Sequence, residues 1–328
     1  MASEDKPKPI TIMGANASGK TEVALALAAL TGGEIVSADS KQIYKHLCAG
    51  TAKPAGVWSE GPGRGVYLVS GIPYHLVDIL DPRESYDAGA FTRQAREKIA
   101  EIQARGKTPV IAGGTGMYIQ ALWNGLDPLP ASDPALRSEL ARTAEEKGKE
   151  ALHLMLKELD PRAALTIPAG NIQRVMRAIE ITKLCGRPVS EIWSGRFFNA
   201  LPVHLGKFIF FHWKKELLAE RIKQRTAARF DEWAEETKSL LDLGCPEDAP
   251  GLKSLGYPQV LDFRSGRSTR AEAIHSIVTL SVSYAKRQNT WFSRYKNVRR
   301  VELESFEQYL PEKIAAAIID DKSDSSLC

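Results

Sequence analysis

The sequence predicts an α/β protein in which helices flank a mainly parallel sheet and a helical insertion interrupts the sheet domain. Short apolar runs alternate with helical patterns over residues 1–126. The strand pattern stops between Asp127 and Leu205, and it returns at Lys207. Strands that alternate with helices indicate a parallel sheet whose ligand lies beyond the carboxyl ends of the strands.

The first expected strand is the short apolar run over residues 9–13, which stops at Gly14. Residues 21–30 are rich in alanine and leucine and have helical spacing. The chain therefore begins with a strand, a glycine-containing loop and a helix, in that order.

Two further short strands are expected in the first part of the chain. The strand over Glu34–Ser37 ends in a polar cluster at Asp39 and Ser40. The strand over residues 109–112 ends in the glycine-rich turn at residues 113–116. Between them, residues 88–105 predict an amphipathic helix, and the Gly- and Pro-rich residues 56–73 predict a surface loop.

The middle of the chain predicts a helical insertion, because prolines cluster at its start and charge-rich helical stretches without strand signals follow. We therefore expect a first core segment over residues 1–126, the insertion over 127–205 and a second core segment over 206–328. The second core segment begins with a strand over residues 207–211. Helices over 214–243 and 270–294 and a frayed tail over 320–328 complete the prediction.

The composition is that of a globular protein, with 43% hydrophobic and 26% charged residues in a chain of 328. No apolar run approaches the roughly 18 residues that cross a membrane. The polar N-terminus leads straight into a strand without an export signal, so a cytoplasmic protein is expected. The four cysteines lie far apart, which makes a structural zinc site or a disulfide framework unexpected.

Residues 14–21, Gly-Ala-Asn-Ala-Ser-Gly-Lys-Thr, satisfy the pattern G-x-x-x-x-G-K-[ST]. In this pattern backbone N–H groups wrap a phosphate, the lysine neutralises charge and the hydroxyl can hold Mg²⁺. The strand before it and the helix after it are the context that the pattern needs. We therefore predict a P-loop NTPase-like core that binds a polyphosphate or pyrophosphate, rather than a glycine-rich turn without a ligand.

A kinase or ATPase would normally have a second apolar strand that ends in an aspartate and supports Mg²⁺. Here the strand over residues 109–112 ends in glycines and Thr115 instead. Asp39 places one carboxylate near the phosphate loop, where it could support the metal indirectly or take a proton from a nucleophile. Its alternative role is that of a helix N-cap.

The combination of motifs resembles the tRNA dimethylallyltransferases, also called tRNA isopentenyltransferases, of the bacterial type without a C-terminal zinc finger. Seven blocks occur in the family's order along nearly the whole chain. They lie at residues 14–21, 39–44, 50–54, 113–119, 171–180, 256–257 and 284–292. This family commonly has Gly-Pro-Thr at the start of the phosphate loop, where Gly14-Ala15-Asn16 stands here.

The resemblance implies transfer of a dimethylallyl group from dimethylallyl diphosphate to the exocyclic N6 of the adenine immediately 3′ of the tRNA anticodon. It also implies that the P-loop holds the diphosphate of the donor, with Mg²⁺ at Thr21, and that the enzyme acts on the anticodon stem-loop. We expect a monomer that does not bind membranes, although the sequence alone leaves the oligomeric state open. The implied diphosphate-binding residues are Gly14, Ala15, Asn16, Ala17, Ser18, Gly19, Lys20, Thr21 and Arg225.

By the same resemblance Asp39 is the general base, and Thr115 is a further catalytic group that can stabilise the leaving diphosphate. The target base must leave its stack to reach the donor. The implied tRNA contacts come from the first core segment, the insertion and the C-terminal part. They are Asp39, Ser40, Lys41, Gln42, Thr115, Arg137, Gln173, Arg174, Val175, Met176, Arg177, Lys253, Ser254, Leu255, Gly256, Tyr257, Pro258, Lys286, Arg287, Gln288, Asn289, Thr290, Trp291, Phe292 and Ser293.

Two of these segments also have plain structural interpretations. Residues 172–179 have the apolar spacing of an ordinary amphipathic helix, which is compatible with a tRNA contact on another face. Basic and aromatic residues alternate over residues 281–300, which suits either nucleic acid or a solvated helix face above a core seam. For Trp291 and Phe292 we expect core packing rather than base stacking.

Three other functions remain open on the sequence alone. A relative that prenylates free adenine nucleotides would share the loop chemistry, but it would have less use for the basic blocks at residues 173–177 and 286–300. A nucleotide kinase would turn over ATP at the loop. A P-loop RNA-binding module without catalysis would handle tRNA equally well after replacement of Asp39.

Overall fold

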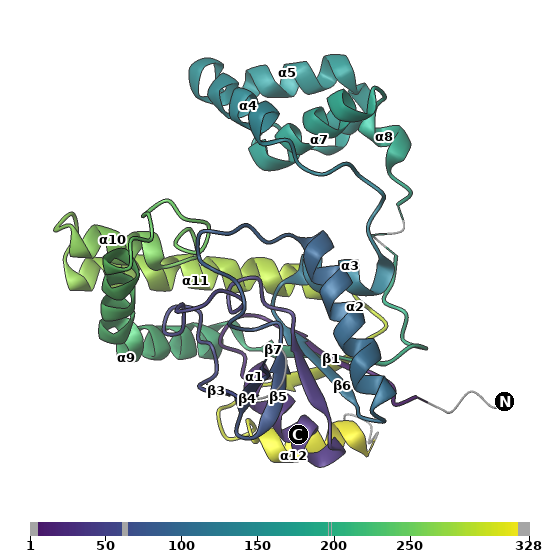
Figure 1. Ribbon diagram of the computed structural model, residues 1–328, viewed down its shortest axis with the longest axis vertical. Helices are drawn as coiled ribbons and strands as arrows, with labels where there is room; N and C mark the ends of the chain where they lie inside the picture. The colour runs from purple at the N-terminus through teal and green to yellow at the C-terminus, as the bar shows by residue number, and fades with distance from the viewer. Residues whose placement is uncertain (1–5, 61–64, 196, 198, 321–328) are drawn as a thin grey trace. The chain divides into compact units, whose positions relative to one another are not determined.

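The computed structural model describes residues 6–60, 65–195, 197 and 199–320. The chain divides into two units, one made of Met1–Trp123 with Ala200–Cys328 and one made of Asn124–Asn199. The first is an α/β unit and the second is helical (Figure 1). The predicted α/β fold with a helical insertion is confirmed, whereas the predicted frayed tail lies outside the described residues from 321 onward.

The first unit is built on one sheet with the strand order β3-β4-β5-β2-β6-β1-β7-β8. The strands from β5 to β8 in this order are parallel, and β3 and β4 are antiparallel additions at one edge. The strands are β1 (Ile10–Gly14), β2 (Glu34–Ser37), β3 (Val57–Trp58), β4 (Tyr67–Val69), β5 (Ile72–His75), β6 (Pro109–Gly113), β7 (Lys207–Trp213) and β8 (Arg299–Leu303).

The expectation of a surface loop over residues 56–73 is wrong, because this stretch contains β3, β4 and the start of β5. Tyr67 and Val69 are buried and Leu68 between them is half-buried, so a two-residue period is present but spans only three residues. Ser70 and Gly71 both have positive φ, 51° and 79°, which is the backbone of a tight hairpin turn. A strand of three residues among glycines and prolines has too short an alternation of buried and exposed positions to be predicted from the sequence.

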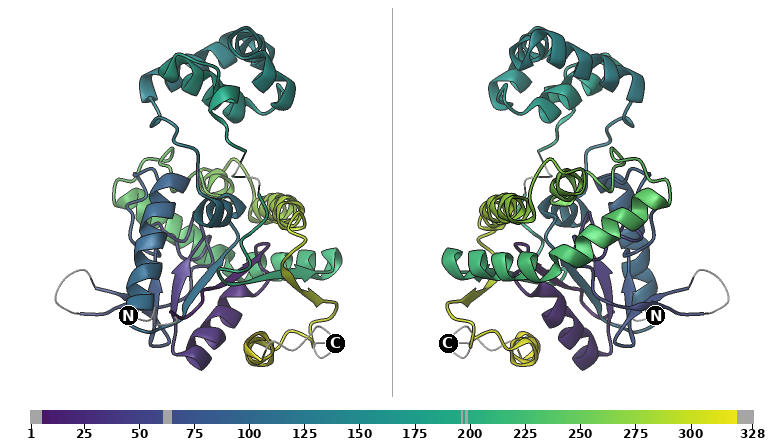
Figure 2. Two further views of the ribbon diagram at one scale, coloured as in Figure 1. Left: turned by 90° about the vertical axis from the view of Figure 1, so that its right-hand side faces the viewer. Right: turned by 90° about the vertical axis from the view of Figure 1, so that its left-hand side faces the viewer.

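Helices cover both faces of the sheet (Figure 2). One face packs on α1 and α12, and the other packs on α2, α3 and the end of α11. Among the described residues, no helix combines the length and apolar character that a membrane span needs. The helices of this unit are α1 (Lys20–Thr31), α2 (Ala88–Ala104), α3 (Gly116–Asn124), α9 (Lys215–Asp242), α10 (Tyr257–Arg264), α11 (Arg270–Phe292) and α12 (Pro311–Ile319). The last residue of α3, Asn124, is the first residue of the second unit.

The central strands are buried on both faces, which explains their nearly continuous apolar sequence. Along β1, Ile10 and Ile12 face the core of α1, whereas Met13 faces the core of α2. The parallel register places Met13 beside Gly113 and Ser37 beside Ala112. The loops that follow β1, β2 and β6 therefore emerge side by side at the carboxyl ends of the central strands.

The second unit is a small helical bundle with its own buried core. Leu140, Leu152, Val175 and Ile179 lie at the centre of this core. Its helices are α4 (Pro134–Lys147), α5 (Lys149–Leu159), α6 (Pro161–Thr166), α7 (Ile172–Cys185) and α8 (Val189–Ile192).

Candidate active site

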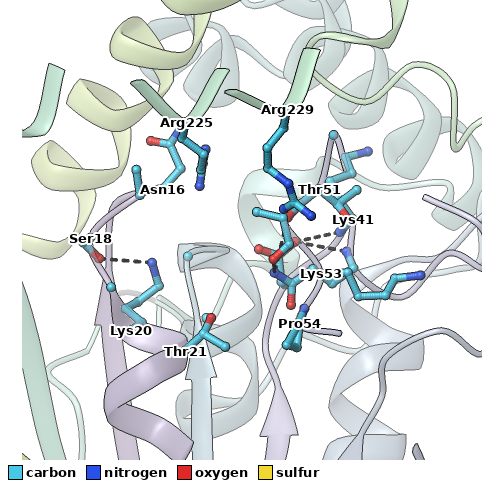
Figure 3. Close-up of a pocket in the computed structure, with 18 of the residues that line it drawn as sticks. Asn16, Ser18, Lys20, Thr21, Lys41, Thr51, Lys53, Pro54, Arg225 and Arg229 are labelled. Atoms are coloured by element: carbon cyan, nitrogen blue, oxygen red, sulfur yellow. Dashed lines mark hydrogen bonds between the residues drawn. The ribbon is translucent and has the colours of Figure 1, made fainter. Parts of the chain in front are cut away.

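The phosphate loop turns sharply between β1 and α1. Ala17 and Gly19 both have positive φ, 60° and 84°. The Ser18 amide donates to the Ala15 carbonyl at 3.3 Å. Lys20 stretches back along the loop, and its Nζ donates to the Ala15 carbonyl oxygen at 2.5 Å and to Ser18 Oγ at 3.2 Å (Figure 3). The loop therefore has the form of an anion cradle at a helix N-terminus.

Burial lowers the pKa of Lys20 to about 8, against the opposing attraction of Asp39. The Arg225 guanidinium also lowers the pKa of Lys20. Lys20 consequently shares its surroundings with a carboxylate and a second cation. A polyanionic ligand would favour the charged form of this lysine.

The affinity of the cavity for a diphosphate ligand is expected to fall as pH rises above 8. Below that pH Lys20 is charged with or without the ligand, so its titration does not affect binding. Above it the free site has lost this proton, and binding must take the proton up again, which weakens affinity by up to about tenfold per pH unit. Calorimetry at pH 7 and pH 9, in buffers with different ionisation enthalpies, measures the proton uptake. Uptake that persists in Lys20→Met would contradict the assignment to Lys20.

Asp39 lies on a turn just after β2. Its Oδ1 accepts hydrogen bonds from the backbone amides of Lys41 at 2.8 Å and Gln42 at 3.3 Å. The Thr115 hydroxyl accepts from the Ser40 amide at 3.0 Å and donates to Ser40 Oγ at 3.3 Å. The turn after β2 and the glycine-rich turn after β6 are thus tied together. The Asp39 carboxylate lines the same cavity as the phosphate loop. Thr115 instead hydrogen-bonds with Ser40 and so holds the turn that carries Asp39.

This cavity has a volume of about 720 Å³ and is lined on several sides by charged and polar groups. Arg225 and Arg229 of α9 enter it opposite Lys20 and Thr21 (Figure 3). Burial, followed by the repulsion of Arg229 and Arg221, lowers the pKa of Arg225 to about 10, which leaves the guanidinium charged at neutral pH. Among the described residues Arg225 has no hydrogen-bond or ion-pair partner, so its donors are free for an anion.

The segment over residues 50–54 forms another wall of the cavity. Lys53 is buried, donates to the Tyr44 carbonyl oxygen at 2.6 Å and forms an ion pair with Asp78 at 2.5 Å. The Gln42 side-chain amide donates to the carbonyl oxygens of Thr51 and Ala52 at 3.3 and 3.2 Å. Lys53 therefore anchors the segment over residues 50–54 to Tyr44 and Asp78. Gln42 connects the same segment to the turn that carries Asp39.

Gln288 of α11 is buried between the phosphate loop and the glycine-rich turn after β6. Its Oε1 accepts from the Asn16 amide at 2.8 Å, and its Nε2 donates to the Gly114 carbonyl oxygen at 2.7 Å. A Cβ on Gly114 would lie 2.4 Å from this amide nitrogen, so glycine is required for the close approach. One side-chain amide therefore sets the spacing of the two loops.

Replacing Gln288 with methionine is expected to lower the free energy of unfolding by about 2 kcal/mol, because two buried backbone groups lose their partners. The kcat/KM for the donor should fall as well, since both loops line the cavity. Urea denaturation and steady-state kinetics measure the two effects. The control is Gln103→Met, which removes a bond to the Pro7 carbonyl oxygen away from the cavity. Equal donor kinetics in the two variants would exclude this role for Gln288.

The other predicted tRNA residues of this unit divide into exposed and buried ones. Lys253, Pro258, Lys286, Arg287 and Thr290 are exposed. Ser254, Gly256, Tyr257 and Phe292 are buried, and Leu255, Asn289, Trp291 and Ser293 are partly buried.

Two of these buried aromatic residues have clear structural partners. The Tyr257 hydroxyl donates to Glu236 Oε1 at 2.5 Å, and the other Glu236 oxygen accepts from the amides of Cys48 and Ala49. Phe292 is fully buried in the core of α2 and α3, as expected for packing. Trp291 lies partly buried against Gly116, whose added Cβ would lie 2.4 Å from its ring.

Two of the predicted tRNA residues of the second unit, Arg137 and Arg177, lie against Glu180, which is fully buried. Arg177 pairs with Glu180 at 2.6 Å and donates to the Pro130 carbonyl oxygen, and Arg137 approaches Glu180 at 3.5 Å. Burial alone would raise the pKa of Glu180, but hydrogen bonds, first of all from Arg177, lower it. On the same helix Gln173 and Arg174 are exposed, whereas Val175 and Met176 are buried in the core of this unit.

The cavity offers oxygen ligands for a divalent metal ion, but no complete protein cage. Among the described residues, no group of three or more His, Cys, Asp or Glu side chains could hold a metal. The Thr21 hydroxyl and the Asp39 carboxylate line the cavity, as does the buried Tyr74. A hard cation held by one or two protein oxygens, phosphate oxygens and water fits this donor set.

Three residues at the phosphate loop were not predicted as site residues: Trp213, Arg221 and Tyr309 contact it directly. Arg229 was also missed. Arg221, Arg225 and Arg229 are spaced four apart on one helix, and this spacing places them on one face. That signal could have identified the arginines, but no sequence pattern indicates Trp213 or Tyr309.

Comparison with known proteins identifies the family. The family model for IPP transferase matches residues 42–295, and the model for isopentenyl transferase matches residues 8–72. A tRNA dimethylallyltransferase of Elusimicrobium minutum is 47% identical over 293 residues, which cover 89% of this chain and 94% of the relative. One of Myxococcus xanthus is 40% identical, with 88% of this chain and 90% of the relative covered.

Solved structures agree with this assignment. A tRNA isopentenylpyrophosphate transferase from Bacillus halodurans has a TM-score of 0.64 and 32% identity, with 96% of each chain covered. A eukaryotic dimethylallyltransferase acting on tRNA has a TM-score of 0.75 at 22% identity, covers 98% of this chain and 81% of that chain, and supports the fold alone. The chain therefore belongs to the IPP transferase family, to which the tRNA dimethylallyltransferases belong.

Proposed function

We propose that this protein transfers the dimethylallyl group of dimethylallyl diphosphate to N6 of the adenine 3′ of the tRNA anticodon, position 37. The products are N6-dimethylallyladenosine in tRNA and diphosphate. The observation that carries the proposal is the shared cavity, in which Lys20, Thr21 and Arg225 can hold a diphosphate and Asp39 offers a carboxylate. Family membership supports the same reaction.

The cations of the cavity act on the leaving group. As the allylic carbon–oxygen bond breaks, negative charge develops on the diphosphate. Lys20, Arg225 and the loop amides are fixed around the position where that charge grows, so they stabilise the transition state more than the ground state. Burial in a partly enclosed cavity strengthens these interactions relative to water.

The carboxylate acts on the nucleophile. The N6 amine forms the new bond to the allylic carbon and then carries one proton too many. Asp39 is held by two backbone amides through Oδ1, which leaves Oδ2 to accept that proton. The adenine must leave the anticodon stack to reach the cavity, at a cost of a few kcal/mol.

A divalent metal suits this chemistry, and we propose Mg²⁺. Thr21 and the diphosphate itself would supply its ligands, because the described residues form no cage of His, Cys, Asp or Glu side chains for it. Mg²⁺ would add charge neutralisation at the leaving group. Because the diphosphate site and Asp39 come from one chain, we also propose that the monomer is active, and that it works in the cytoplasm where it meets tRNA.

The test incubates the purified protein with Mg²⁺, dimethylallyl diphosphate and either unmodified tRNA or AMP, and the nucleosides are then identified by mass spectrometry. N6-dimethylallyladenosine in tRNA alone is the expected result. Product from AMP alone would transfer the function to the free-nucleotide prenyltransferases. No product from either acceptor would reject prenyl transfer.

A further inference from the structure

Three consecutive carbonyl oxygens of the phosphate loop are each bound by a side chain from outside the loop. The Ala17 oxygen accepts from Arg221 Nε at 2.9 Å, and the Ser18 oxygen accepts from Trp213 Nε1 at 3.1 Å. The Gly19 oxygen accepts from the Tyr309 hydroxyl at 2.7 Å. We call Trp213, Arg221 and Tyr309 the loop clamp.

The members of the loop clamp also hold one another. The Arg221 guanidinium lies 4.8 Å from the Trp213 ring and 4.8 Å from the Tyr309 ring, so it contacts both as a cation–π partner. The two rings lie 5.7 Å apart at an angle of 49°. Trp213 ends β7 and is almost fully buried, and Arg221 lies on α9. The three donors therefore form one packed group rather than three independent contacts.

Tyr309 also packs directly on the loop. A Cβ on Gly19 would lie 2.3 Å from the Tyr309 ring, so the contact requires a glycine at this position. Tyr309 comes from the segment between β8 and α12, and α12 packs on α1 in the same core. A segment near residue 309 thus contacts the phosphate loop, which lies near residue 19.

The loop clamp determines which groups the loop offers to a ligand. In a trans peptide the C=O and the following N–H point in opposite directions. With the Ser18 and Gly19 oxygens held by the clamp, the amides of Gly19 and Lys20 point away from it. Ala17 adopts a positive φ that is unfavourable for any residue with a side chain, and its oxygen is held by Arg221 in that conformation.

We infer that Trp213, Arg221 and Tyr309 are positioning residues for the donor's diphosphate. They bind the loop's carbonyl oxygens and so keep its amide donors aligned for an anion. The inference rests on the proposed function only in naming the anion as a diphosphate. It assigns a role in donor binding to the C-terminal Tyr309 and to the indole of Trp213.

The test measures binding of inorganic diphosphate with Mg²⁺ by calorimetry, using the full chain. Tyr309→Phe removes only the hydroxyl, which donates to the Gly19 carbonyl oxygen and also lies 3.1 Å from Glu22 Oε2, and a three- to tenfold weaker affinity is expected. The KM for dimethylallyl diphosphate should rise by the same factor, and the KM for tRNA should stay constant. The matched control is Tyr86→Phe, which removes the hydroxyl bond to Gln94 outside the cavity and should bind diphosphate like the parent.

Arg221 needs two variants, because it carries charge as well as a hydrogen bond. Arg221→Met should weaken diphosphate binding more than Tyr309→Phe. Arg221→Lys keeps the charge but loses the flat group between the two rings, and it should restore affinity only partly. Parental diphosphate affinity in Arg221→Lys would mean that only the positive charge of this residue matters. Arg221 would then not act as a member of the loop clamp.

Parent-like diphosphate affinity in both Tyr309→Phe and Arg221→Met would overturn the inference. A parent protein that does not bind diphosphate would overturn it as well. A parent that binds diphosphate but does not modify tRNA would leave the clamp intact and reject the proposed function instead.

Discussion

Replacing Asp39 with asparagine is expected to lower the rate of prenyl transfer by about a thousandfold while tRNA binding is retained. A positioned general base typically contributes 10²–10⁴-fold. Asparagine keeps an oxygen that can accept from the Lys41 and Gln42 amides, so the turn after β2 should remain in place. It cannot accept the proton from N6. Single-turnover kinetics with dimethylallyl diphosphate and tRNA, together with a filter-binding assay for tRNA, measure the two properties.

The matched control is Asp87→Asn. Asp87 caps α2 and accepts from the Ala90 amide at 2.8 Å, and it lies outside the cavity. This variant should transfer the prenyl group at the parental rate. Comparable turnover in Asp39→Asn and the parent would show that another group accepts the proton.

Replacing Lys20 with methionine is expected to lower kcat/KM for the donor by a factor of a hundred or more. Hydrogen bonds to charged groups contribute about 1.5–3 kcal/mol, and loss of a donor that stabilises developing charge costs about 10²–10³ in kcat. Methionine preserves most of the apolar length of lysine, so the loop should still pack. Steady-state kinetics with varied dimethylallyl diphosphate give the split between KM and kcat.

Lys223→Met is the control for this variant, because it removes the same charge from an exposed residue of α9. It should leave the donor kinetics unchanged. A Lys20→Met enzyme with parental kcat and KM would mean that the diphosphate binds elsewhere than at the phosphate loop.

The sequence was sufficient for the parts of the fold that depend on local pattern. The expected strands over Glu34–Ser37, residues 109–112 and residues 207–211 are confirmed, because central parallel strands are apolar on both faces. The P-loop pattern likewise determines its own context of strand, turn and helix. Asp39 was expected near this loop because both follow strands of one parallel sheet. The pairing of β1 and β2 with β6 brings them together.

The remaining features depend on contacts between distant segments, and local pattern carries no signal for them. Tyr309 and Gly19 are 290 positions apart, and Gln288 and Asn16 are 272 apart. Nothing near Tyr309 in the sequence distinguishes it from a surface tyrosine. Gln288 illustrates the same difficulty, since its place in a basic helical segment suggested an RNA contact, whereas the structure buries its side chain between two loops.

The helical insertion begins and ends at nearly the same point, because the Asn124 side chain donates to the Asn199 carbonyl oxygen at 2.6 Å. Of the residues that the structure describes between 124 and 199, none belongs to the three hydrophobic cores of the α/β unit. A chain segment whose ends meet can be added to or removed from a domain with little disturbance. The α/β unit therefore supplies its own hydrophobic packing within the described residues, so we expect substitutions in the insertion to leave the packing around the phosphate loop unchanged.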